Sequence, residues 1–233
     1  MIDTKPDLIA KNVGQLLESI PAEVTLVAAA KARSPEEIEA AVQAGITCIG
    51  QNYVQEAERV ISRIGSEVRW HMIGHLQRNK VKKAMRIFDM IQTVDSWRLA
   101  MALERSGETS GKTMPVLIEI NSGREPNKTG VLPEEAEDLV VKVSRLQHLR
   151  IQGLMTMGPR FGDPEEARPF FRATKEAFDI LAARGIPNVS MKTLSMGMSN
   201  SYRIAIEEGA NLVRIGSSIF GNRPAGQDCE WVG

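Results

Sequence analysis

The chain has 233 residues, the length of one large domain, and 42% of them are hydrophobic, enough for a substantial core. Its 29 Lys and Arg residues balance its 29 Asp and Glu residues, so the charge favours neither nucleic acid nor a membrane surface as partner. No apolar run approaches the roughly 20 residues of a membrane span, and no signal peptide is visible at the N-terminus. Two distant cysteines, Cys48 and Cys229, favour a reducing compartment, and we expect a cytoplasmic protein.

Short apolar runs alternate with amphipathic stretches along the chain. After a helix at 6–19, strands are predicted at 24–30, 47–50, 70–74, 90–94, 114–121, 149–157, 189–196 and 212–220. Capping residues mark the helices between them: Ser34 precedes Pro35 and two glutamates, and Gly45 ends that helix. Similar signals predict helices at 96–105, 133–147, 163–183 and, capped by Ser199, at 200–208.

Strand and helix alternate so regularly that a parallel sheet is predicted. Eight such units in a chain of this length favour one closed (β/α)8 TIM-type barrel of α/β class over an open doubly wound sheet. No linker or low-complexity segment divides the chain. We therefore expect a single domain over residues 1–233, with a short N-terminal helix at 6–19 and a tail at 224–233.

Functional groups of such a barrel gather at the C-terminal ends of its strands. Lys31 follows the first run, and if the strand continues to it, its side chain shares the inward face with Val27 and Ala29. A lysine partly desolvated there can form a Schiff base. Position alone favours the plainer interpretation, an ammonium group that reaches solvent at a strand end.

Arg214 interrupts an apolar run, on the face predicted to point into the barrel. An inward arginine needs an acceptor, because an unpaired buried charge is very costly. A ligand could supply that acceptor, and so could an acid on a neighbouring strand, and the sequence leaves both open.

Two neighbouring strand ends, 195–200 and 214–218, have the composition of a phosphate cup. Gly197 permits close backbone approach, Ser199 offers the free N–H groups of a helix start, and Gly216 and Ser217 add donors from the next strand. Each feature alone is equally typical of an ordinary cap or turn.

Other motifs favour structural roles. Residues 107–113 resemble a P-loop but are one residue short and follow a helix, so we expect a surface loop. The basic stretch from Arg78 to Arg86 is typical of a solvated helix face. His71 and His75 are predicted to lie on different elements, which disfavours a zinc site.

Several long motifs resemble the PLP homeostasis proteins (the YggS/PROSC family), whose fold is that of the N-terminal barrel of alanine racemase, a fold-type III PLP protein. The motifs, in order over residues 24–223, are VAAAK (27–31), GQNYVQE (50–56), WHMIGHLQRNK (70–80), GLM (153–155), LSMGMS (194–199) and VRIGSSIFG (213–221).

The resemblance implies pyridoxal 5'-phosphate (PLP) as cofactor, held as an internal aldimine on Lys31. Asn52 matches the asparagine near the ring hydroxyl, Arg214 the arginine facing the pyridine nitrogen, and Ser199, Gly216 and Ser217 the phosphate-binding positions. The chain departs from the family's usual pattern at Ala30, before the lysine, and at Gln51, where the family commonly has glutamate.

A cation beside the pyridine nitrogen makes the ring a poorer electron sink. The chain also ends soon after the barrel, without the racemase's extra domain, so we expect a carrier that stores or delivers PLP, without robust catalysis. Its expected partners are apo PLP enzymes, and it is expected to be a monomer. Two alternatives remain: an amino-acid racemase, which needs Tyr53 or Tyr202 opposite Lys31, and a cofactor-free Schiff-base aldolase, which needs an inward carboxylate near Lys31.

Overall fold

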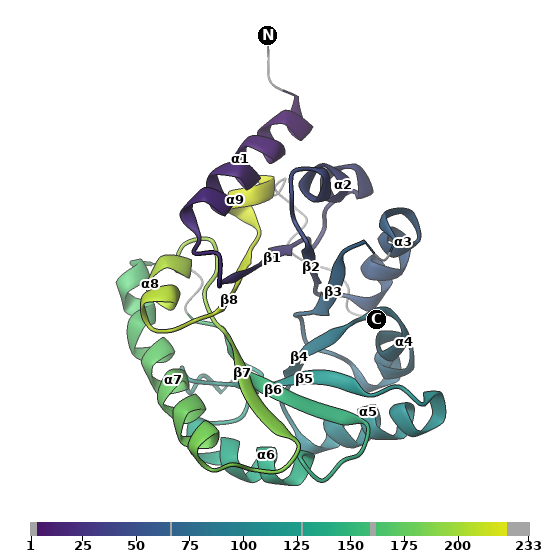
Figure 1. The fold of residues 1–233 in the computed structure, drawn as a ribbon, viewed down its shortest axis with the longest axis vertical. Helices are drawn as coiled ribbons and strands as arrows, with labels where there is room; N and C mark the ends of the chain where they lie inside the picture. The colour runs from purple at the N-terminus through teal and green to yellow at the C-terminus, as the bar shows by residue number, and fades with distance from the viewer. Residues whose placement is uncertain (1–3, 66, 127, 159–161, 223–233) are drawn as a thin grey trace.

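Eight parallel strands form a closed barrel in the order β1-β2-β3-β4-β5-β6-β7-β8, with β8 paired to β1 (Figure 1). The computed structural model describes residues 4–65, 67–126, 128–158 and 162–222. The strands are β1 (Thr25–Ala29), β2 (Cys48–Gln51), β3 (Arg69–Met72), β4 (Met90–Val94), β5 (Met114–Ile120), β6 (Leu149–Thr156), β7 (Val189–Ser195) and β8 (Leu212–Ile215). This architecture confirms the predicted barrel.

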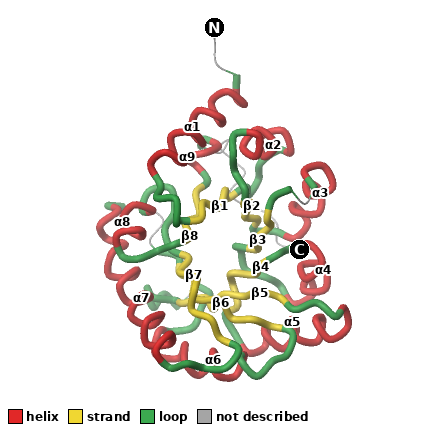
Figure 2. Tube along the Cα trace, in the orientation of Figure 1, coloured by secondary structure: helices red, strands yellow, loops and turns green. Residues whose placement is uncertain are grey.

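The helices surround the ring of strands, as Figure 2 shows in red around yellow. They are α1 (Lys5–Ser19), α2 (Pro35–Gln43), α3 (Val54–Ile64), α4 (Val81–Ile87), α5 (Trp97–Ser110), α6 (Ala136–Val143), α7 (Arg168–Ala183), α8 (Tyr202–Glu207) and α9 (Ser217–Phe220), with 3-10 turns η1 (Arg78–Lys80), η2 (Pro133–Glu135) and η3 (Pro164–Ala167). Within the described residues no helix is long and apolar enough to cross a membrane.

Two different apolar layers hold the barrel together. Most buried apolar side chains lie in one cluster with members on strands and helices alike. Separate small clusters fill the inside of the barrel: Val27, Cys48 and Leu212 in one, and Met90, Leu117 and Met155 in the other. The alternation of strand side chains produces this division, because every second residue points into the ring. Cys48 is a fully buried core residue, and this burial raises the pKa of its thiol to about 12.

Three local predictions differ from the structure. The run 212–220 is a strand only to Ile215, and 217–220 is helix α9, because Gly216 breaks the extended conformation. Ser199 does not cap the helix that follows it, since the N-cap of α8 is Ser201. Residues 107–110 are the last turn of α5 and not a loop, and Gly111 ends that helix with φ of 69°. The glycine in that turn, Gly107, packs against His148, where a Cβ would come within 2.3 Å.

Gly153 allows β6 to pass next to β7. It has φ of 150°, and a Cβ on it would lie 1.8 Å from the carbonyl oxygen of Thr193. The register of the β6–β7 pair shifts between Ile151 and Gly153, so this glycine serves the irregularity that lets the two strands pair.

Candidate functional site

Lys31 lies in a turn just beyond β1 and is half-buried. The strand ends at Ala29, one residue before its predicted end, so the condition that the strand continues to Lys31 is not met, and the turn sets the direction of the lysine. Ala32 has φ of 57°, and its N–H donates to Oε2 of Glu56 at 3.0 Å. The Lys31 ammonium lies 5.6 Å from the centre of the Tyr53 ring.

The same turn is tied to the C-terminal end of helix α9, which follows the barrel's last strand. Arg33, two residues after Lys31, donates hydrogen bonds to the carbonyl oxygens of Phe220 and Gly221 at 3.2 and 2.5 Å. It also lies 3.4 Å from Glu37, the acid in the capping box of α2. The turn around Lys31 is thus fixed from both sides.

Asn52 directly follows β2, and the backbone of β3 comes very close to it. A Cβ on Gly74 would lie 2.6 Å from the backbone oxygen of Asn52 and 2.7 Å from its Cα. Only glycine fits there, so Gly74, just after β3, allows the close approach to Asn52 at the barrel mouth.

The predicted phosphate cup forms from two adjacent strand ends. The backbone N–H groups of Gly216 and Ser218 donate to Oγ of Ser199 at 3.2 and 3.3 Å. Gly216 lies against β1, where its Cβ would be 3.1 Å from the oxygen of Ala29. Gly197 has φ of 89° and contacts α8 in the same way. The donors come from backbone amides rather than from a long helix, since α8 and α9 are both short.

Arg214 is buried inside the barrel, with 4% of its surface exposed. One terminal nitrogen, Nη1, donates to Oγ of Ser195, and the other, Nη2, donates to the carbonyl oxygen of Thr156 at 2.8 Å. No carboxylate of the described residues forms an ion pair with it. The structural alternative raised by the sequence, an ion pair with an acid on a neighbouring strand, is therefore wrong. Burial lowers the pKa of Arg214 to about 10.

Arg214 begins a hydrogen-bonded chain across the barrel interior. Ser195 Oγ donates to Oε1 of Gln92 at 2.7 Å, and Nε2 of Gln92 lies 2.9 Å from Nδ1 of His71. Because Ser195 accepts from the arginine, its own proton must go to Gln92, and the Gln92 amide nitrogen must then donate to His71. His71 is consequently neutral with its proton on Nε2. Burial agrees with this, lowering the pKa of His71 to about 4.

Glu119 is a buried acid on the inward face of β5. Thr129 Oγ1 donates to its Oε1 at 2.7 Å, and no described residue satisfies its Oε2. Burial raises the pKa of this carboxyl group, and the nearby charge of Arg214 opposes the rise. Glu119 thus moderates the arginine's charge through space, without contact.

Comparison with known proteins shows the family of this barrel. Residues 5–224 match the family described as alanine racemase, N-terminal domain. A pyridoxal phosphate homeostasis protein of Aquifex aeolicus is 38% identical over 199 residues, covering 85% of this chain and 86% of that protein. A relative from Haemophilus influenzae with the same name is 38% identical over 203 residues, covering 86% of this chain and 85% of that protein. The chain belongs to the pyridoxal phosphate homeostasis family.

Solved structures extend this result. PipY of Synechococcus elongatus, a structure with PLP bound, superposes with a TM-score of 0.83 at 31% identity, over 91% of this chain and all of PipY. Alanine racemase of Clostridium difficile superposes with a TM-score of 0.77 at 16% identity, over 94% of this chain and 57% of the racemase. The racemase shares the barrel fold with this member of the homeostasis family.

The fold brings the six predicted cofactor residues of this family member to one half of the ring. They are Lys31, Asn52, Ser199, Arg214, Gly216 and Ser217, and all follow or lie in β1, β2, β7 and β8, which are consecutive in the closed barrel. Ser217 is exposed at the mouth. The racemase alternative needs a tyrosine opposite Lys31. Tyr202 does not serve, because its hydroxyl lies 3.5 Å from Oγ of Ser19 at the end of α1.

Sequence reasoning missed the inner chain of His71, Gln92 and Ser195, and it missed Glu119. Each is a polar residue at an inward position of an apolar strand, and that signal alone singled out Arg214. The backbone N–H of Ser218 in the phosphate cup was also missed, because a backbone donor leaves no signal in the side-chain sequence.

Proposed function

We propose that this protein binds PLP covalently on Lys31 and serves PLP homeostasis as a carrier that stores or delivers it. The site residues fit this cofactor. The Ser199 hydroxyl and the amides of Gly216 and Ser218 suit a phosphate group, because backbone N–H groups converging on one point favour an anion. PLP, when bound, would supply an aldehyde group for condensation with the Lys31 amine, with loss of water.

One observation carries the proposal: the buried Arg214 has its two terminal nitrogens on neutral acceptors and contacts no acid of the described segments. A guanidinium group held this way offers its remaining N–H to a neutral acceptor such as a pyridine nitrogen. It disfavours protonation of that nitrogen, and therefore disfavours carbanion chemistry. A cofactor whose ring nitrogen stays unprotonated is suited to storage and delivery rather than to catalysis.

The carrier role involves further proposals. We propose that Asn52 contacts the ring hydroxyl, that Ser217 adds a phosphate contact, and that apo PLP enzymes receive the cofactor from a monomer in the cytoplasm. The relatives named for PLP homeostasis support the role, and the exposed position of Ser217 at the mouth suits an open site.

The decisive experiment is the visible absorption spectrum of the purified protein before and after borohydride, followed by peptide mapping. We expect a yellow protein that bleaches and carries a reduced pyridoxyl group on Lys31. Lys31→Ala should abolish the visible band, while Lys82→Ala on the exposed face of α4 should leave it unchanged. A colourless protein that added PLP cannot reconstitute would refute the proposal.

Carrier and racemase are separated by two further measurements on the loaded protein. We expect PLP to pass to an apo enzyme and restore its activity, and we expect no sustained interconversion of D- and L-alanine. Multiple-turnover racemisation that Tyr53→Phe abolishes would favour the racemase instead, because Tyr53 is the tyrosine beside Lys31.

A further inference from the structure

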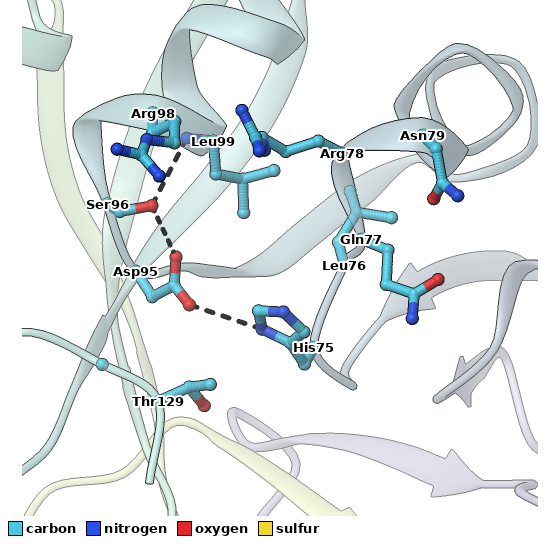
Figure 3. A pocket seen from close by; sticks show the side chains of 11 residues that line it. His75, Leu76, Gln77, Arg78, Asn79, Asp95, Ser96, Arg98, Leu99 and Thr129 are labelled. Carbon is cyan, nitrogen blue, oxygen red and sulfur yellow. Dashed lines mark hydrogen bonds and ion pairs between the residues drawn. The ribbon is translucent and has the colours of Figure 1, made fainter. Parts of the chain in front are cut away.

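A cavity of about 670 Å³ opens at the C-terminal ends of β3 and β4 (Figure 3). This half of the ring lies opposite the β7–β8 cup. The cavity has the size of a small-molecule site, which is typically about 300–1,000 Å³. The family motif after β3, the start of α5 and the loop after β5 line it: His75, Leu76, Gln77, Arg78, Asn79, Asp95, Ser96, Arg98, Leu99, Thr129 and Gly130.

Two arginines that have no acidic partner among the described residues line this cavity. Arg78 begins η1, Arg98 lies in the first turn of α5, and Figure 3 shows the Arg78 side chain extending toward the start of α5. Among the described residues neither forms an ion pair. Some other arginines do so: Arg124 binds Glu134, and Arg168 binds three glutamates.

The one acid in the cavity is already engaged. Asp95 accepts a hydrogen bond from Ser96 Oγ at 2.9 Å, and its other oxygen lies 3.4 Å from Nδ1 of His75, as the dashed lines of Figure 3 show. Helix α5 has 14 residues and no acidic side chain in its first turn. The positive end of its dipole therefore adds to the two guanidinium groups, and Asp95, next to the N-cap Ser96, is the acid that opposes them.

We propose that this cavity binds a small organic anion carrying a phosphate or carboxylate group, held by Arg78 and Arg98. Guanidinium groups match the planar oxygen pairs of both anions. The site gives a function to the 70–80 motif, of which the PLP proposal uses only Gly74. It is separate from Lys31 and does not rest on PLP binding.

The test uses the full-length protein and two probe anions, pyrophosphate and citrate, at constant ionic strength. Trp97 is the local reporter, because it lies between Ser96 and Arg98 and is 42% exposed. We expect a saturable, one-site change in fluorescence and in titration heat, both in PLP-free protein and after saturation with PLP. Trp97→Phe should remove the fluorescence change and keep the heat. A preference between the probes identifies phosphate or carboxylate as the bound group.

Matched double variants separate a site from general charge. Arg78→Gln with Arg98→Gln should weaken binding by about tenfold or more, because charge-assisted hydrogen bonds are lost. Lys82→Gln with Arg86→Gln removes the same charge from the exposed face of α4, outside the cavity. It should change affinity by less than about twofold, since exposed charges at a distance are screened.

Three results would overturn the inference: no saturable binding, equal loss in the two double variants, or binding that PLP abolishes. The last would place the anion at the Ser199 cup. A failure of the PLP proposal is recognised separately, as a missing visible band, and it leaves the PLP-free titration interpretable.

Discussion

Replacing Gln92 with leucine removes the middle of the buried hydrogen-bonded chain at nearly constant volume. Gln92 is fully buried, accepts from Ser195 at 2.7 Å and contacts His71 at 2.9 Å. The substitution leaves one donor and one acceptor unsatisfied, each costing about 1–3 kcal/mol. The added apolar burial offsets about 1–2 kcal/mol. With the middle of each range, about 4 kcal/mol lost and about 1.5 kcal/mol offset, the free energy of unfolding should fall by about 2.5 kcal/mol, out of about 5–15 for a typical domain.

Urea unfolding followed by circular dichroism measures this change. Gln15→Leu, the same replacement at an exposed position of α1, is the control and should stay within about 0.5 kcal/mol of wild type. Ser195→Ala combined with Gln92→Leu should cost less than the sum of the single variants, because both interrupt one chain. If Gln92→Leu were as stable as the control, or the two losses simply added, the chain would not be a cooperative unit.

Three further predictions concern stability. Gly153→Ala should lower the free energy of unfolding by about 2–6 kcal/mol or prevent folding, since its Cβ would meet the carbonyl oxygen of Thr193. The control Gly14→Ala, in open space on α1, should add about 0.5–1 kcal/mol. Equal denaturation midpoints of the two variants would contradict this. The pKa of His71 is lowered to about 4, so the unfolded state takes up its proton first and stability should fall as pH drops from about 6.5 toward 4, by about 1.4 kcal/mol per unit. His71→Gln should flatten that slope, and an unchanged slope would exclude His71 as its cause. Burial raises the pKa of Glu119 above its ordinary value, so stability is lost as pH rises through and above the ordinary range of glutamate. Glu119→Gln should therefore gain stability relative to wild type as pH rises, and a difference that stays constant with pH would argue against a raised pKa.

Local patterns were sufficient for the frame of the site. Periodicity and capping residues placed the first seven strands within two residues of their observed bounds, the eighth at its start only, and the position after the first strand singled out Lys31. Errors occurred where a neighbour decides the conformation. The segment 217–220 has the composition of a strand, yet it turns into a helix at Gly216, whose close approach to Ala29 depends on the closing of β8 against β1.

The sequence by itself determined the barrel, the lysine at its mouth and an arginine inside it, because strand periodicity and a charge in an apolar run are local signals. Only the tertiary structure decided what surrounds that arginine. Ser195 and Gln92 are 103 residues apart in the chain, and they meet across the barrel interior only because the barrel closes. The cavity of Arg78 and Arg98 is also a tertiary feature, since the segments that follow β3, β4 and β5 meet there only once these strands pair side by side in the sheet.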